Sequence, residues 1–68
     1  MKIYRNEEYV LRHKRFGYYH GGFYSSIHNW VDVHDIDDAV VFTGKVLMDS
    51  PYDFSLNWNI IKLDWNAI

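Results

Sequence analysis

The chain has 68 residues, the length of one small domain, and carries 7 Lys and Arg against 9 Asp and Glu, for a net charge of −2. Its 49% hydrophobic content excludes a disordered segment, and the absence of Cys excludes a disulfide scaffold and a thiolate metal site. No apolar run reaches the roughly 18 residues of a membrane-spanning helix, and we expect no signal peptide. We therefore expect a single domain over residues 1–68 in the cytoplasm, without membrane association.

The first predicted elements form a hairpin. Residues 8–14 alternate as a strand does, with a core face of Tyr9, Leu11 and His13 and a solvated face of Val10, Arg12 and Lys14. Residues 15–17 form the loop, because Gly17 tolerates a positive φ, and residues 18–20 return as the second strand. The glycine pair at 21–22 then breaks or bulges this strand, and residues 23–33 continue as extended chain.

A short helix is predicted over residues 36–42. Asp35 suits the N-cap, and Asp37 and Asp38 fill a first turn where acids complement the helix dipole. Ile36, Ala39 and Val40 share one face of such a helix. Thr43-Gly44 interrupts it, residues 45–49 can add a second helical turn, and Ser50-Pro51 ends that turn.

The last predicted elements are a loop over residues 51–57 and a closing strand over residues 58–65. One face of this strand holds Ile61, Leu63 and Trp65, and the other holds Trp58, Ile60 and Lys62. Apolar residues on both faces favour a strand that is central or covered on both sides. The predicted fold is therefore α+β: a small antiparallel sheet of three to four strands with one short helix, about 36–42, packed on one face.

Charge is unevenly distributed along the chain. Residues 1–20 carry a local charge of +3, and the remainder carries −5. The ordinary interpretation is two solvated faces, with Asp35, Asp37 and Asp38 capping the helix. The functional interpretation is an acidic patch of Asp32, Asp37, Asp38 and Asp53 for a basic partner, or a basic hairpin that contacts phosphates.

The residues that usually carry catalysis or bind metals lack the required spacing. His34-Asp35 is a pair, and His13, His20 and His28 add three imidazoles, but no two of them have the i, i+4 spacing of a helical metal site. The serines lie in no nucleophile motif, and Gly21-Gly22 precedes extended chain rather than a helix. A domain of this size rarely encloses a cleft of about 300 Å³. We therefore expect no enzyme, metal site or cofactor.

The 13 aromatic residues exceed what so small a core can hide, so we expect some of them at a surface. Tyr19, Phe23 and Tyr24 are the candidate anchors of a partner-binding face, with Asp37, Asp38 and Asp53 supplying electrostatic fit. An alternative set for nucleic acid is Arg12, Lys14, Arg15 and Tyr18, with Tyr19 beside them.

Four segments in order carry a resemblance: YVLRHK at 9–14, GYY at 17–19, Trp30 and DIDDAVVF at 35–42. This order resembles small bacteriophage accessory proteins, which pair a basic hairpin with a Trp and an acidic helix entry and close on a valine-rich strand. Residues 43–56 depart from that pattern, since they hold Pro51 and few helix formers where such proteins often continue a helix. The resemblance implies a short intracellular phage protein that binds a host enzyme or a defence complex. It carries over no catalytic residue.

Three functions remain. The leading hypothesis is a non-catalytic protein-interaction module, plausibly a phage-encoded modulator or inhibitor of a host protein. The second is a single-stranded nucleic-acid-binding protein that uses the basic hairpin, which is less favoured because the whole chain is anionic. The third is a structural homo-oligomer, such as a homodimer, that hides its aromatic side chains against a copy of itself.

Overall fold

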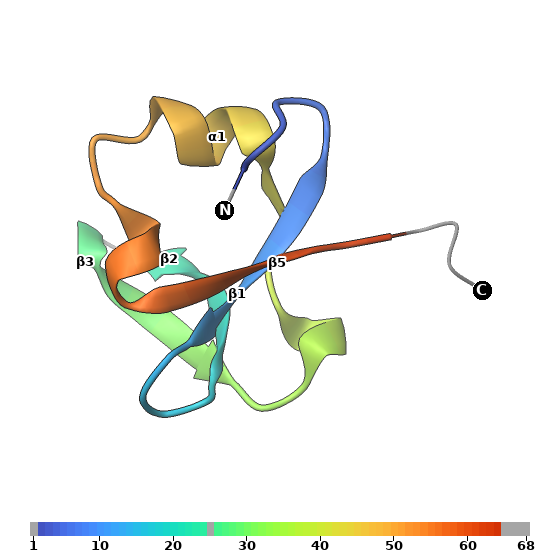
Figure 1. The fold of residues 1–68 in the computed structure, drawn as a ribbon. Coiled ribbons are helices and arrows are strands. Elements are labelled where there is room, and N and C mark those ends of the chain that lie inside the picture. The colour runs from blue at the N-terminus through green and yellow to red at the C-terminus, as the bar shows by residue number, and fades with distance from the viewer. Residues whose placement is uncertain (1, 25, 65–68) are drawn as a thin grey trace.

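The computed structural model describes residues 2–24 and 26–64, without the side chains of residues 26–28. Within this part the chain forms five strands, one short α-helix and two 3-10 turns (Figure 1). The strands are β1 (Glu8–His13), β2 (Tyr19–Tyr24), β3 (Ser26–Val33), β4 (Phe42–Thr43) and β5 (Trp58–Lys62); the others are η1 (Ile36–Asp38), α1 (Gly44–Asp49) and η2 (Phe54–Leu56). The predicted α+β class is confirmed, with more strands than the three to four expected.

The central strand of the sheet is β1. The strand order is β3-β2-β1-β4, and β5 also pairs antiparallel with β1, from Tyr9 opposite Lys62 to His13 opposite Trp58. Of the two interpretations left open for the closing strand, the central position is wrong, because among residues 2–24 and 26–64 β5 pairs only with β1 and ends at Lys62. The apolar residues on both faces of β5 are explained by packing above and below the sheet. They do not require a neighbouring strand on each side. Trp65, predicted on this strand, lies outside the described residues.

The faces of β1 follow the predicted alternation with one exception. Tyr9 and Leu11 are buried in the core as expected, and Arg12 is exposed on the other face. Val10 was expected on the solvated face, but only 1% of it is exposed. It lies opposite Ile61, and Tyr19 shares its face because it pairs with Arg12. Apolar side chains of both neighbouring strands therefore stand beside Val10.

The helix predicted over residues 36–42 is wrong. Only the 3-10 turn η1 forms there, and Asp35 makes no side-chain capping hydrogen bond. The chain is extended again by Ala39, the Val40 N–H donates to the His20 carbonyl at 2.9 Å, and Phe42 is buried in β4. A seven-residue helix is marginal on its own and β-branched residues weaken it, so pairing with the sheet prevails.

The α-helix instead begins where an interruption was expected. The Thr43 hydroxyl caps α1 by accepting the Val46 N–H at 3.4 Å, and the helix ends at Asp49, just before Ser50-Pro51 as predicted. Gly44 is required at the first position because a Cβ there would collide with the Tyr4 carbonyl. The capping threonine and this close approach turn the expected helix breaker into a helix start.

Glycines shape the two hairpins as the sequence predicts. Gly17 has φ +76° in the β1–β2 loop, and Gly22 has φ +107° at a register shift between His20 and Phe23. The bulge turns the buried His20 ring into a core of Tyr9, Leu11, Phe42, Leu47, Phe54 and Trp58. The core is thus largely aromatic, and it buries some of the aromatic side chains that were expected at a surface.

Candidate interaction groove beside β5

A groove of about 600 Å³, open to solvent, lies between α1, the segment at 50–55 and β5. Figure 1 shows how these elements are arranged, with α1 above, η2 at the left and β5 crossing the front. Its apolar lining includes Ile3, Leu47, Phe54, Trp58 and Ile60. The groove is larger than the cleft of about 300 Å³ that a domain of this size rarely encloses, but it is open to solvent rather than enclosed. The cleft arises because the sheet stops at β5, where α1 and the loop that follows it overhang the last strand.

The ladder between β1 and β5 determines which backbone groups of β5 face the groove. The Lys14 N–H donates to the Asn57 carbonyl and the Leu63 N–H donates to the Glu8 carbonyl, both at 2.9 Å. In an antiparallel pair the residues that point toward the neighbour alternate with those that point away. The N–H and C=O groups of Trp58, Ile60 and Lys62 therefore point to the outer edge of β5. No strand among residues 2–24 and 26–64 pairs with that edge.

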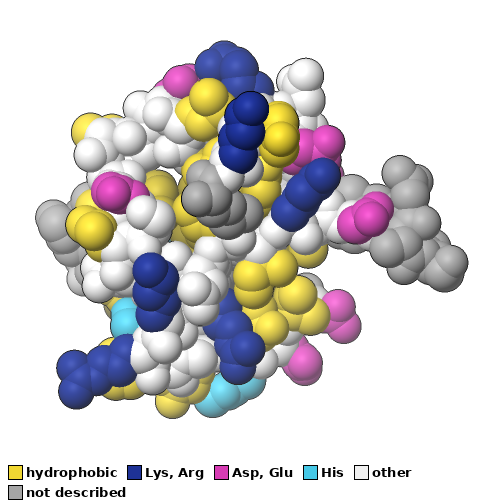
Figure 2. Space-filling view, in the orientation of Figure 1, with side chains coloured by type: hydrophobic (Ala, Val, Ile, Leu, Met, Phe, Trp, Pro, Cys, Tyr) yellow, Lys and Arg dark blue, Asp and Glu magenta, His cyan; other side chains and the backbone are white. Residues whose placement is uncertain are grey.

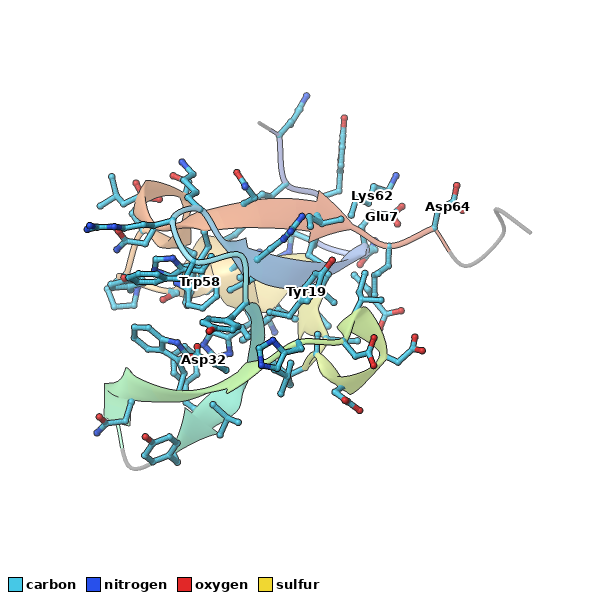
Figure 3. The ribbon with its side chains drawn as sticks, turned by 90° about the horizontal axis from the view of Figure 1, so that it is seen from below. Glu7, Tyr19, Asp32, Trp58, Lys62 and Asp64 are labelled. Carbon is cyan, nitrogen blue, oxygen red and sulfur yellow. The ribbon has the colours of Figure 1, made fainter. Side chains whose placement is uncertain are left out.

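The side chains of the same three residues divide this edge into an apolar part and a charged end. Trp58 is 2% exposed and lies between β5 and the β2–β3 hairpin, and Ile60 is half-buried (Figure 3). Lys62 is exposed at the other end, where its Nζ is 4.0 Å from Glu7 Oε1 (Figure 3). A chain lying along β5 would meet open backbone groups beside an apolar floor.

At the opposite end of the groove, hydrogen bonds connect Lys14, Asp53 and Ser55. The Lys14 Nζ donates to the Ser55 carbonyl at 2.6 Å, which ties the β1–β2 turn to η2. Asp53 accepts the Ser55 N–H at 3.0 Å and the Ser55 hydroxyl at 2.6 Å. These hydrogen bonds from Ser55, the hydroxyl first, hold the pKa of the Asp53 carboxyl below its usual value, and the Lys14 charge lowers it further.

The six predicted partner-binding residues do not share one surface. Asp53 lines the groove, and the Phe23 ring lies 6.0 Å from the Phe54 ring, which also lines it. Tyr24 is exposed at the end of β2, whereas Tyr19 lies at its start, roughly 17 Å away at the usual rise of a strand. Asp37 and Asp38 are exposed on η1. Sequence reasoning missed Ile3, Leu47 and the edge of β5, because nothing in the sequence tells how many neighbours a strand has.

The alternative residues for nucleic acid do come together, at the β1–β2 turn. The Arg12 Nε donates to the Gly17 carbonyl at 3.2 Å, and the Arg15 guanidinium lies 5.6 Å from the Phe16 ring, which is 63% exposed. Tyr18 contacts the His34 ring edge-on at 4.9 Å. Arg12, Lys14 and Arg15 are all exposed, and Lys and Arg side chains gather at the lower left of Figure 2 around this turn.

Histidines play structural parts in this molecule. His20 is fully buried, with Phe23, Phe42 and Trp58 rings within 5.1 Å, and its Nδ1 accepts the Gly22 N–H at 3.0 Å. Its Nε2 has no partner among the described residues. Burial lowers the pKa of His20 to about 4, although the Asp32 charge acts in the opposite direction. His28 was named with the other imidazoles, and its side chain lies outside the described part.

The described residues contain no group of three or more His, Cys, Asp and Glu that could hold a metal ion. Within the same ranges, none of the helices has the length and apolar character needed to cross a membrane. No family model, curated protein or solved structure matches this chain.

Proposed function

We propose that the protein is a non-catalytic protein-interaction module that binds an extended segment of a partner protein along the outer edge of β5. The observation that carries the proposal is the coincidence of two outward-pointing backbone positions with an apolar groove. Ile60 and Lys62 each offer one donor and one acceptor at this edge, and the groove lies beside Ile60. The Trp58 backbone points the same way, but this residue is 2% exposed and closed to a partner.

This arrangement suits recognition by strand addition. Main-chain hydrogen bonds to the edge supply affinity, and pockets for alternate side chains supply specificity. Each such hydrogen bond contributes about 1 kcal/mol, and apolar side chains in the groove add to that sum. The Ile60 side chain is half-buried, so it supports a partner side chain without leaving the core.

The resemblance to phage accessory proteins extends the proposal to the kind of partner. The partner would be a host enzyme or a defence complex in the bacterial cytoplasm, and the protein would act as its modulator or inhibitor by occupying one of its strands or termini. A catalytic role is not part of the proposal, because Asp53 is the one carboxylate among the described residues that line the groove, and it is hydrogen-bonded to Ser55.

The test is a tagged pull-down from bacterial lysate, treated with nuclease, that compares backbone and side-chain variants of β5. Ile60→Pro and Lys62→Pro remove outward N–H groups, and Ile60→Val and Lys62→Ala are matched controls that keep them. We expect one protein to be captured at stoichiometric yield by the wild type and the controls and lost with either proline. Equal capture by all five proteins would rule out strand addition, and thermal unfolding of each variant checks its fold.

A second candidate function is favoured by the convergence of Arg12, Lys14 and Arg15 beside the exposed Phe16 ring. A single-stranded nucleic acid could place phosphates on the cations and a base on the ring. Fluorescence anisotropy with labelled single-stranded and duplex DNA and RNA at low salt measures this directly. Affinity that falls steeply with salt is expected if this function is correct, and absence of binding at low salt would remove it.

A further inference from the structure

The β1–β2 turn presents an exposed aromatic ring on a rigid support. Phe16 is 63% exposed, and its ring stacks on the His13 ring with the centroids 4.9 Å apart. The Gly17 N–H closes the turn by donating to the His13 carbonyl at 2.9 Å, and the Phe16 N–H donates to His13 Nδ1 at 3.3 Å. A single exposed ring is common on protein surfaces, so its meaning depends on the side chains around it.

The three cationic side chains at this turn are not part of the ion pairs that the structure shows. Those pairs are made by Arg5 and by Lys62. In the part of the chain that the structure describes, no carboxylate oxygen lies within 4.0 Å of Arg12, Lys14 or Arg15.

The acidic side chains of this region act on Lys14 more than on the arginines. The Lys14 charge lowers the pKa of the Asp53 carboxyl, so each partly neutralises the other. Glu8 lies four residues from Arg12, about 14 Å along β1, and Asp64 follows β5 at that same end of the sheet. The acids at positions 32, 35, 37 and 38 lie on β3 and η1 or between them. The two arginines are therefore the cations best placed for an anionic ligand.

Both arginines lie close to the turn. The Arg12 Nε donates to the Gly17 carbonyl at 3.2 Å, and the guanidinium lies 5.7 Å from the Tyr19 ring. The Arg15 guanidinium lies 5.6 Å from the Phe16 ring. Because a guanidinium carries five N–H donors, Arg12 keeps four for a ligand. A site whose groups are already in place loses less conformational entropy on binding.

An open ring beside two cations suits one class of ligand best. Proteins that bind single-stranded nucleic acid combine cationic side chains for the phosphates with aromatic rings on which bases stack. A duplex keeps its bases stacked inside and offers this turn its phosphates alone. An acidic peptide segment offers carboxylates without a flat base.

From these observations we infer that the β1–β2 turn is a second binding site, separate from the edge of β5, for a short single-stranded segment of nucleic acid. One base stacks on Phe16, and Arg12 and Arg15 contact the phosphates beside it. The inference rests on the second candidate function, which becomes a site that acts beside strand addition instead of replacing it. Figure 1 shows the turn at the opposite end of β1 from α1, and Ile60 and Lys62 lie further along β5, so both sites can be occupied together.

The experiment is a nuclear magnetic resonance titration of the whole protein at low salt. The probes are a twelve-nucleotide oligothymidine, an abasic sugar-phosphate chain of the same length and a twelve-residue polyglutamate. We expect oligothymidine to shift the amide signals of Arg15, Phe16 and Gly17 and to leave those of Ile60 and Lys62 in place. It should bind at least fivefold more tightly than either of the other probes, because they offer no base to stack. Oligouridine of the same length takes the same part for RNA, and the tighter of the two identifies the source of the strand.

Protein variants assign the binding to the ring and to the charge. Phe16→Leu keeps an apolar side chain without the ring, and it should weaken oligothymidine binding at least fivefold while leaving the abasic chain unaffected. Arg15→Gln should weaken oligothymidine binding about three- to tenfold and reduce the slope of log affinity against log salt by about 0.7, the value for one lost phosphate contact. Lys45→Gln makes the same charge change on α1 and should alter the affinity less than twofold.

The contrary results are distinct. Equal binding of oligothymidine and the abasic chain would overturn base stacking, and tighter binding of polyglutamate would assign the turn to an acidic protein segment. No shift of the turn amides with any probe would overturn the site altogether. Loss of oligothymidine binding in Lys62→Pro would overturn the separation of the two sites. None of these results bears on the pull-down with Ile60→Pro, which tests strand addition by itself.

Discussion

Two of the terminal strands of the sheet, β3 and β5, differ in the regularity of their ladders. β3 is the longer strand, but its ladder with β2 is interrupted by two register shifts, between His20 and Phe23 and between Phe23 and Tyr24. β5 makes five consecutive pairs with β1 and has an apolar groove beside it. Bulges twist an edge away from a flat template, whereas a regular edge is ready for a further strand. For the proposed strand addition, the comparison favours the regular β5, with its adjacent groove, over the longer β3.

The largest expected difference concerns the side chains that the two edges contribute to the core. Trp58→Ala on β5 should cost about 3–5 kcal/mol, because the indole is buried and a cavity replaces it. Val31→Ala on β3 should cost less than about 1 kcal/mol, since this side chain is 46% exposed. Urea unfolding followed by circular dichroism measures both, and similar losses would contradict the view that β5 carries the core.

Proline substitutions in β5 test which of its N–H groups point toward β1 and which point to the open edge. Ile61→Pro removes an N–H that points toward β1 and should cost about 3 kcal/mol or more, whereas Lys62→Pro removes one that points outward and should cost about 1 kcal/mol or less. The same unfolding experiment distinguishes them. If Lys62→Pro were the more damaging variant, the assignment of the open edge would be wrong.

Acid should destabilise the β2–β3 hairpin through His20. Burial lowers its pKa from 6.5 to about 4, so the unfolded chain binds the proton more readily than the folded one. The protein therefore keeps this stability above pH 6.5 and loses it progressively as the pH falls toward 4, by up to about 3 kcal/mol. His20→Asn removes the titrating ring while offering an oxygen near the position of Nδ1, and it should flatten the pH dependence measured by thermal unfolding between pH 4 and 7.

The control for that experiment is the same substitution at His13, whose Nδ1 accepts the N–H groups of Arg15 and Phe16 in the β1–β2 turn. His13→Asn should leave the acid sensitivity in place, because this variant keeps the buried His20 ring. If His20→Asn kept the full pH dependence of thermal stability, that dependence would arise from other titrating groups.

The smallest expected effect tests the bulge that makes β3 irregular. Gly22→Ala places a Cβ in open space, so its cost of about 1–2 kcal/mol would measure the backbone strain of a positive φ alone. Gly21→Ala differs, because its Cβ would come within 2.9 Å of Val33 Cγ1 and 3.0 Å of the Val31 carbonyl. Thermal unfolding of the two variants should rank Gly21→Ala as the more damaging, and equal losses would contradict a purely local strain at Gly22.

Local patterns predicted the parts of the fold that depend on neighbouring residues. The alternation in β1, the turn at Gly17, the bulge at Gly22 and the end of α1 before Pro51 all follow from short-range stereochemistry. The helix expected over 36–42 failed because Val40 and Phe42 bond to β2 and β1, partners that are distant in sequence. The groove could not be foreseen for the same reason, since it depends on β5 reaching β1 and then having no further neighbour.

The pairing of Tyr9 with Lys62 joins residues 53 positions apart, and this has a consequence for the time course of folding. Bringing such distant segments together costs loop-closure entropy before any hydrogen bond between them forms. A sheet of this kind therefore folds slowly compared with a helical domain of equal size. During synthesis the even-numbered residues of β1 wait for their partner until residues 58–62 have left the ribosome. The outer edge of β5 forms only with that strand, so a chain truncated before Trp58 would lack this edge while retaining most of its aromatic side chains.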